Sequence, residues 1–127
     1  MWDITAVLDG DCCPVLDGLD EFALVRESDA NGMFDQIERL ANLGHQGFNI
    51  GSCHYVDEGE HIYQLRKGNL RLLFFYGGGN RIIVCSHVFM KSSQKTPASE
   101  ITRAIAAKHA YFASLPVQII EAMDHGA

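Results

Sequence analysis

Arginine and lysine residues close to strongly apolar segments are the side chains of this chain best suited to chemistry. Arg71 lies inside the apolar run 70–76, Arg66 precedes that run, and Lys91 follows the run 81–89. An arginine in such a run must be paired, reach the edge or face a solvent-filled hollow. Cations that converge on one face of a sheet would stabilise the charge that develops on phosphoryl oxygens when a phosphodiester is cleaved.

A structural explanation of Arg71 competes with this one. Residues 9–38 carry many carboxylates, and from spacing alone we favour a salt bridge between one of them and Arg71. The period of two along the strand predicts that Arg71, Leu73 and Phe75 share one face. It predicts for the other face Leu70, Leu72, Phe74 and Tyr76.

Other catalytic patterns have weaker support. The glycine triplet 77–79 is typical of a hairpin turn, because no Gly-Lys-Ser/Thr follows it. The spacing of the cysteines and histidines matches neither a disulfide framework nor a zinc site. A metal-dependent hydrolase that uses His54, His61 and the cysteines remains an alternative function. The cysteines, which we expect to be reduced, are Cys12, Cys13, Cys53 and Cys85.

Composition indicates one folded domain over residues 1–127. Hydrophobic residues make up 47% of the chain and there are 3 prolines, which excludes a disordered protein. No apolar run approaches the ~20 residues of a membrane-spanning helix, and the first residues lack the pattern of a secretory signal. We therefore expect a cytoplasmic protein without membrane association.

The net charge of −6 is divided unevenly along the chain. Residues 1–60 hold 13 acidic and 2 basic side chains, whereas residues 61–127 hold 3 acidic and 8 basic ones. Such asymmetry favours an anionic partner for one surface, although uneven surface charge without function explains it equally well.

Patterning predicts an α+β domain with the order β-α-α-β-β-β-α, in which helices pack on a small antiparallel sheet. Residues 44–61 have no period and suggest a long connection, and residues 91–96 suggest a basic one. The predicted strands are 2–8, 62–66, 70–76 and 81–89. The predicted helices are 14–27, 33–41 after a break at 28–32, 97–112, and a short final helix or strap within 115–124.

Four segments of the second half form a pattern that is known from a protein family. They are 63–66, 70–75, 88–97 and the helix start 100–104. In this order they resemble the E-L-R segment, the arginine-bearing strand and the K-K-T-x-K-T-P signature of the phage-derived HigB branch of the RelE/ParE toxin superfamily. The first half also resembles that family at Pro14-Val15-Leu16, Leu19 and Leu43-Gly44.

This resemblance implies a RelE-like fold and a toxin of a type II toxin–antitoxin system. Such toxins are endoribonucleases that cleave mRNA, usually on the ribosome, and they need no metal or other cofactor. Carried over by position, Arg66 and Arg71 would contact the scissile phosphate, and Lys91 would bind the phosphate or assist the leaving oxygen. Lys67 and Lys95 would bind RNA. The expected partners are mRNA, the ribosome and a helix-turn-helix antitoxin.

The general acid and base are not assigned by the resemblance. Candidates are His87, Lys67, Tyr76 and Tyr111. Three of them have a structural explanation as well: Lys67 as a turn residue, Tyr111 as part of the core, and His87 as a half-buried histidine that shares a strand face with Ile83, Cys85 and Phe89.

Two positions depart from the pattern: Gln64 stands where the family has glutamate, and Ser92 where it has lysine. Because the chain is also acidic overall, the alternative is a RelE-fold protein without catalytic activity, a degenerate toxin whose basic face binds a protein or nucleic acid.

Overall fold

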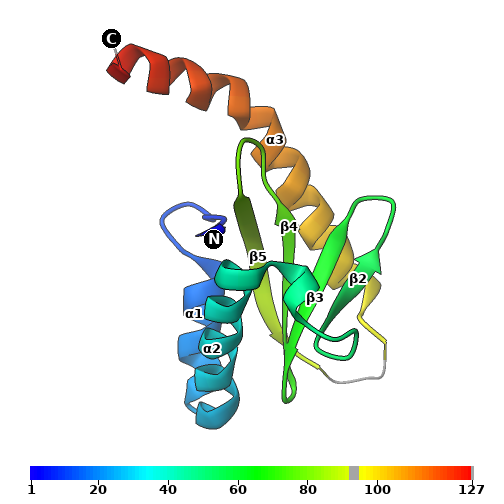
Figure 1. Cartoon of the computed structure of the whole chain (residues 1–127). Coiled ribbons are helices and arrows are strands. Elements are labelled where there is room, and N and C mark those ends of the chain that lie inside the picture. Colours follow the sequence, from blue (N-terminus) through cyan, green and yellow to red (C-terminus); the bar gives the residue numbers. More distant parts are fainter. Residues whose placement is uncertain (92–94, 127) are drawn as a thin grey trace.

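A computed structural model describes residues 1–91 and 95–126, with side chains as far as Ser114. In sequence order, this part of the chain forms β1 (Asp3–Ala6), α1 (Pro14–Ala23), α2 (Glu27–Leu43), the 3-10 helix η1 (His45–Gly47), β2 (Cys53–Asp57), β3 (Ile62–Lys67), β4 (Leu70–Tyr76), β5 (Ile82–Met90) and α3 (Ala98–Gly126). Figure 1 shows α1 and α2 side by side on one side of the sheet, and α3 on the other.

The strands form one mixed sheet in the order β1-β5-β4-β3-β2. Tight turns join β3 to β4 and β4 to β5, so these three strands form the expected antiparallel meander. In the first of these hairpins, Arg66 stands directly opposite Arg71. Strand β1 lies at one edge and pairs with β5 in parallel.

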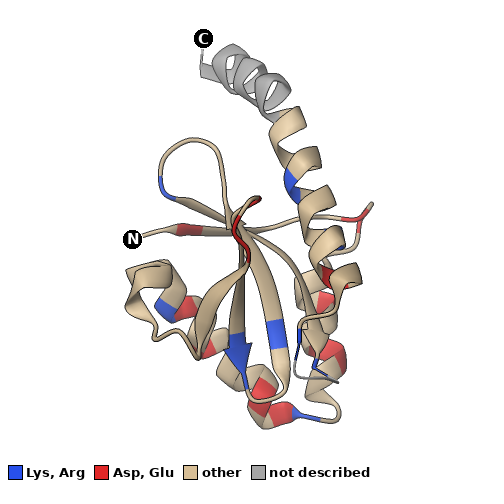
Figure 2. Ribbon diagram, turned by 90° about the vertical axis from the view of Figure 1, so that its right-hand side faces the viewer, with Lys and Arg blue, Asp and Glu red and all other residues tan. Residues whose placement is uncertain are grey.

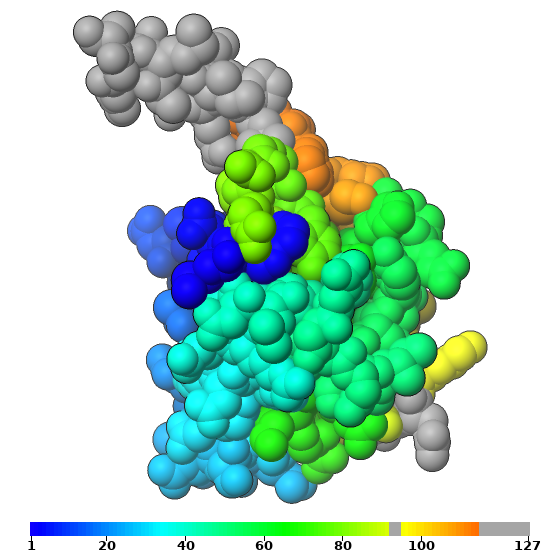
Figure 3. Space-filling view, viewed as in Figure 1, coloured from blue at the N-terminus to red at the C-terminus, as the bar shows by residue number. Residues whose placement is uncertain are grey.

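Side chains of the central strands form two cores, one on each face of the sheet. Leu70, Leu72 and Phe74 pack with Leu19 and Met33 of the helical pair α1/α2. On the other face, Leu73 and Phe75 pack against α3 through Ala104 and Tyr111. The predicted division of β4 into two faces is therefore confirmed. In Figure 3, the blue-to-cyan N-terminal segments cover much of the visible face, beside the green strands.

The predicted α+β class is confirmed, but two details of the sheet differ from the prediction. Residues 53–57, which we assigned to a long connection, form the edge strand β2 and pair with β3. A register shift between Tyr55 and Asp57 interrupts the pairing, and the residues carry little alternation, so the strand depends on its partner rather than on its own pattern. The sheet is also mixed, because β1 is parallel to β5.

The break between the first two helices lies earlier than predicted. We expected it at residues 28–32, where turn-forming residues gather, but α2 already begins at Glu27. Ala30 is 1% exposed and belongs to the same core as Met33 and Leu40, so burial of this face continues the helix through the polar segment. Gly32, within this helix, leaves room for the Lys67 side chain, with which a Cβ at this position would collide.

The last helix is longer than predicted. Instead of a helix 97–112 and a separate element within 115–124, α3 is continuous from Ala98 to Gly126. Residues 92–94 of the predicted basic connection, Ser92 among them, lie outside the described residues. Within the described part of the chain, no helix is both long and apolar enough to span a membrane.

An irregularity in β5 changes the side to which His87 points. Leu73 pairs with His87 whereas Phe74 pairs with Cys85, so Ser86 is an extra residue between them. Ile83 and Cys85 consequently belong to the core under α1 and α2, whereas Phe89 belongs to the core under α3. The prediction that His87 shares a face with Ile83 and Cys85 is wrong.

Candidate active site on the α3 side of the sheet

A cavity of about 330 Å³ lies on the face of the sheet that α3 partly covers. It is formed by β2, β3, β4, the end of β5, the connection after β5 and the first turn of α3. Its lining residues are His54, Tyr55, Val56, Gln64, Arg66, Arg71, Phe89, Lys91, Lys95, Thr96, Pro97 and Ile101. Of these described lining residues, four are cationic and none is an aspartate or a glutamate.

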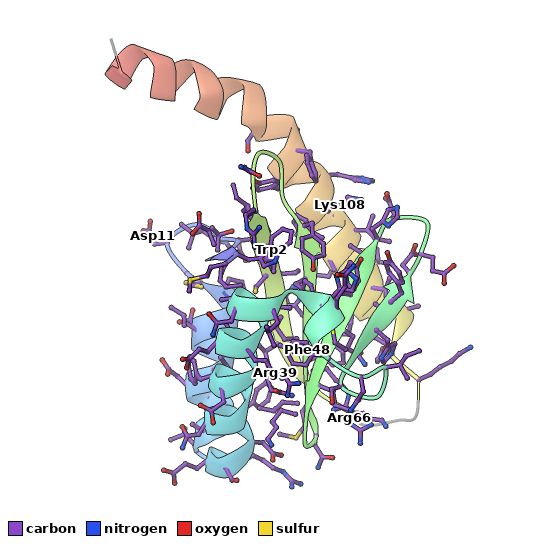
Figure 4. All side chains as sticks on the ribbon, in the orientation of Figure 1. Trp2, Asp11, Arg39, Phe48, Arg66 and Lys108 are labelled. Atoms are coloured by element: carbon purple, nitrogen blue, oxygen red, sulfur yellow. The ribbon has the colours of Figure 1, made fainter. Side chains whose placement is uncertain are left out.

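Arg66 and Arg71 come together because they are cross-strand partners in the β3–β4 hairpin. Like charges directly opposite each other destabilise a sheet, so their pairing suits a role other than stability. Figure 4 shows Arg66 at the end of β3, and Lys95 and Thr96, which precede α3, line the same cavity. Lys91 enters the same cavity from the end of β5, where its backbone N–H donates to the carbonyl of Asn69 over 2.7 Å.

The buried position of Arg71 is the most informative feature of the cavity. The side chain is 4% exposed, and its Nη1 donates to the carbonyls of Gly68 over 2.8 Å and of Leu70 over 2.9 Å. Burial, and then the neighbouring charge of Arg66, lower the pKa of Arg71. Throughout the described residues, Arg71 has no acidic partner within ion-pair distance. The salt bridge that spacing favoured is thus not present in this part of the chain.

The acidic residues that could have paired with Arg71 are carried mainly by the helical layer on the opposite face of the sheet. In Figure 2, red positions are frequent on the helices, and blue positions occur on the central strands as well as on helices and turns. The separation of charge across the sheet is partial, since Lys67 lies on the α2 side and Glu100 on the α3 side. An anion that enters the cavity meets several positive charges and, among the described lining residues, no aspartate or glutamate.

Gln64 and Thr96 join the sheet to the connection before α3. Gln64 is 5% exposed, and the Thr96 hydroxyl donates to its Oε1 over 2.6 Å. This hydrogen bond holds the segment that carries Lys95 and Pro97 across the open side of the cavity. The departure from the family pattern at position 64 thus lies inside the candidate site.

His54 is a site residue that we did not predict for this chemistry. Its Nδ1 lies 3.1 Å from the carbonyl oxygen of Ile50. Because a carbonyl only accepts, Nδ1 carries a proton there, and in the neutral ring Nε2 is left as a proton acceptor. His54 reaches the cavity because it stands opposite Gln64 in the β2–β3 pair. Recognition of β2 as a strand would have revealed this.

The two lysines predicted to bind RNA lie on different sides of the sheet. Lys95 lines the cavity. Lys67 lies instead on the α2 side, in a hollow that it shares with Glu27 and Asp35. The alternation of β3 explains the difference, since Lys67 follows Arg66 and must point to the opposite face. The structure therefore brings together Arg66, Arg71, Lys91 and Lys95, but not Lys67.

The remaining acid–base candidates do not line the cavity. His87 is 1% exposed, rather than half-buried; its Nδ1 lies 2.8 Å from the Ser86 hydroxyl and its Nε2 lies 3.2 Å from Glu100. Burial, followed by the charge of Arg103, lowers the pKa of His87. Tyr76 is on the other face with His45, and burial raises its pKa. Tyr111 packs against Phe75.

The residues invoked for a metal site are dispersed. His54 lines the cavity, whereas His61 contacts the Tyr55 hydroxyl from the turn before β3. Burial raises the pKa of Cys53 and of Cys85 to about 12, so both are thiols at neutral pH. Across the described residues, no group of three histidine, cysteine, aspartate or glutamate side chains is placed to hold a metal ion.

Comparison with known proteins identifies the family. The family model described as phage derived protein Gp49-like (DUF891) matches residues 25–109, which include every lining residue of the cavity. No curated protein matches the chain. The narrower assignment to the HigB branch stays a prediction. Since the family model matches more than half of its length, the chain belongs to the Gp49-like phage-derived protein family, a family of RelE/ParE-like toxins.

Proposed function

We propose that this chain is the toxin of a type II toxin–antitoxin pair and that it cleaves mRNA, as a HigB-like endoribonuclease of the cytoplasm. The observation that carries the proposal is the buried Arg71, which lines a cationic cavity without an acidic partner among the described residues. An arginine fork held by two backbone carbonyls is oriented before a phosphate arrives, so little entropy is lost on binding.

In the proposed reaction, the 2′-hydroxyl of the RNA attacks the adjacent phosphorus. The O2′–P bond forms and the P–O5′ bond breaks, which yields a 2′,3′-cyclic phosphate and a free 5′-hydroxyl. Arg66 and Arg71 stabilise the negative charge that grows on the non-bridging oxygens. His54 Nε2 accepts the proton of the 2′-hydroxyl, and Lys91 gives a proton to the leaving 5′-oxygen.

The proposed partners follow from the charge distribution and the family. Ribosome-bound transcripts would meet the cationic face, and Lys95 would hold a neighbouring phosphate at the edge of the cavity. A helix-turn-helix antitoxin would neutralise the toxin by occupying that same face. Because the net charge is −6, binding must depend on the local cluster rather than on the overall charge.

The proposal is tested by inducible expression with transcriptome-wide mapping of 5′-hydroxyl RNA ends. We expect growth arrest and new ends inside coding regions for the wild type, and neither for Arg71→Ala. Arg26→Ala is the matched control, since Arg26 is exposed ahead of α2 and outside the cavity, and it should behave as the wild type.

The outcome also separates the catalytic reading from the alternative. Folded wild-type protein that binds RNA or a protein through the cationic face, without growth arrest and without new ends, would show a binding module that does not cleave. New ends that persist in Arg71→Ala would refute the proposed site.

A further inference from the structure

We propose that the cavity holds one nucleotide of the RNA and that Gln64 selects a base with a carbonyl oxygen, uracil or guanine, over one with an amino group at the same place. This inference rests on the proposed function, because it assumes that Arg66 and Arg71 hold an RNA phosphate. It adds a specificity-determining residue, which the catalytic scheme does not use.

The orientation of Gln64 carries the argument. Its side chain is 5% exposed, and its Oε1 already accepts the Thr96 hydroxyl over 2.6 Å. The group left to face the cavity is the amide NH₂, which only donates. A glutamine with both ends free can bind adenine with its oxygen and nitrogen together, but in Gln64 the Thr96 hydroxyl occupies one lone pair of Oε1, so the amide N–H groups are the main hydrogen-bonding groups that it offers a nucleotide.

The distance along β3 matches the size of a nucleotide. Gln64 and Arg66 point to the same face and are two residues apart, which is about 7 Å along a strand. A phosphate on Arg66 and Arg71 therefore places the base of the same nucleotide beside Gln64. The cavity of about 330 Å³ is at the small end of the range for ligand sites, as suits one nucleotide.

Apolar side chains provide surfaces for the base. Val56 comes from β2, Phe89 from β5 and Ile101 from α3, and all three line the cavity next to the cations. An aromatic ring and aliphatic groups can stack on any base, so they contribute affinity without sequence preference. Selection is then left to the polar groups of the lining, and among them the Gln64 amide is the one to which the proposed reaction gives no role and which lies one nucleotide length from Arg66.

Donor and acceptor chemistry determines which base is preferred. Uracil and guanine carry a carbonyl oxygen where cytosine and adenine carry an amino group. The carbonyl accepts from the Gln64 amide, whereas the amino group would set two donors against each other inside a buried site. A carboxylate at this position would reverse the preference and also neutralise part of the charge of Arg71.

The test is binding of 2′-deoxy tetranucleotides of uridine or of cytidine, which lack the attacking hydroxyl and so are not cleaved. We expect the wild type to bind the uridine form about tenfold more tightly in a fluorescence anisotropy titration at fixed salt. Gln64→Leu should bind both forms equally, and Gln64→Glu should weaken binding and favour cytidine. Gln46→Glu, an exposed position in η1, adds the same charge away from the cavity and should leave the ratio unchanged.

The outcomes distinguish this inference from the proposed function. Binding that is unchanged in Arg71→Ala refutes the proposed function, and the inference with it. Binding that requires Arg71 but shows no uridine preference in the wild type refutes the inference alone, whether or not the Gln64 variants fold. A preference that persists in folded Gln64→Leu also refutes it, because another group would then select the base.

Discussion

The guanidinium of Arg71 donates to two backbone carbonyls and stands opposite Arg66, so two positive charges share one face of a hairpin. In a protein selected for stability alone, an acid would be expected beside them. Three neutral or cationic side chains complete the surroundings instead: Gln64, His54 and Lys91. At the scale of single residues, the positively charged side chains of the site are therefore arranged to bind an anion.

His54 gives a prediction at this scale. His54→Asn removes the proton acceptor of the proposed reaction, and we expect the single-turnover cleavage rate to fall by about 10²–10⁴-fold. Binding of a 2′-deoxy oligonucleotide should stay within about twofold of the wild type, since the cations are intact. The measurement is single-turnover cleavage of a labelled RNA, beside a binding titration.

The matched control is His61→Asn. His61 lies outside the cavity and has a backbone φ of 56°, which asparagine tolerates. A loss of cleavage in His61→Asn equal to that in His54→Asn would contradict the role given to His54, and so would full activity of His54→Asn.

At the scale of elements, the turn between β3 and β4 connects the helical layer to the cationic cavity. The carbonyl of Gly68 accepts from Arg71, while the backbone N–H of Asn69 donates to the Asp29 carboxylate of α2 over 3.3 Å. Gly68 itself has a φ of 57°, and a Cβ at this position would collide with Asp29. The turn therefore needs glycine both for its conformation and for its close approach to α2.

Glycine substitutions test this arrangement. We expect Gly68→Ala to lower the free energy of unfolding by about 2–3 kcal/mol, through the left-handed conformation and the collision together. Gly10→Ala should cost about 1 kcal/mol, because Gly10 has a similar φ of 62° but open space around it. Urea unfolding of both variants measures the difference. Equal losses would show that the contact with Asp29 contributes nothing.

Much of the element arrangement could be predicted from patterns within single segments. The alternation along residues 70–76 placed Arg71 correctly, and the turns around 68 and 77–79 predicted the meander that brings Arg66, Arg71 and Lys91 together. These signals are local, because neighbouring strands joined by tight turns have almost no freedom in how they pair.

The features that sequence reasoning missed depend on contacts between distant segments. β2 exists because β3 offers it an edge, α2 starts early because Ala30 fits into the core, and Lys67 faces acidic residues of a distant helix. The extra residue at Ser86 reverses the faces of β5 without any turn signal in the sequence. For the same reason, the position of His54 in the cavity was not predicted.

At the scale of the whole molecule, the buried His87 and the partly buried His45 link folding to pH. Burial lowers the pKa of His45 and of His87. The unfolded chain therefore binds more protons than the folded one as the pH falls below about 6.5, the ordinary value for histidine. The part of the stability that depends on these rings is complete above that pH and is lost as the pH falls towards their folded pKa values.

Thermal unfolding at several pH values measures this dependence. We expect Tm to fall between pH 7.5 and pH 5, and to fall less steeply in His87→Gln, in which the buried group no longer titrates. His45→Gln should act in the same direction, and the double variant should be flattest. Profiles of His87→Gln and wild type that run parallel would contradict the assignment.

The parallel pairing of β1 with β5 has a consequence for the order of events during synthesis. Asp3 of β1 can pair only after Ile82 of β5 has been synthesised. The cavity is lined by residues as far apart in the sequence as His54 and Ile101. A growing chain that has emerged only through β4 lacks the neighbour that β1 needs, and lacks Lys91 and Thr96 as well. Under the proposed activity, a nascent toxin cannot cut the message that encodes it until translation has passed the start of α3.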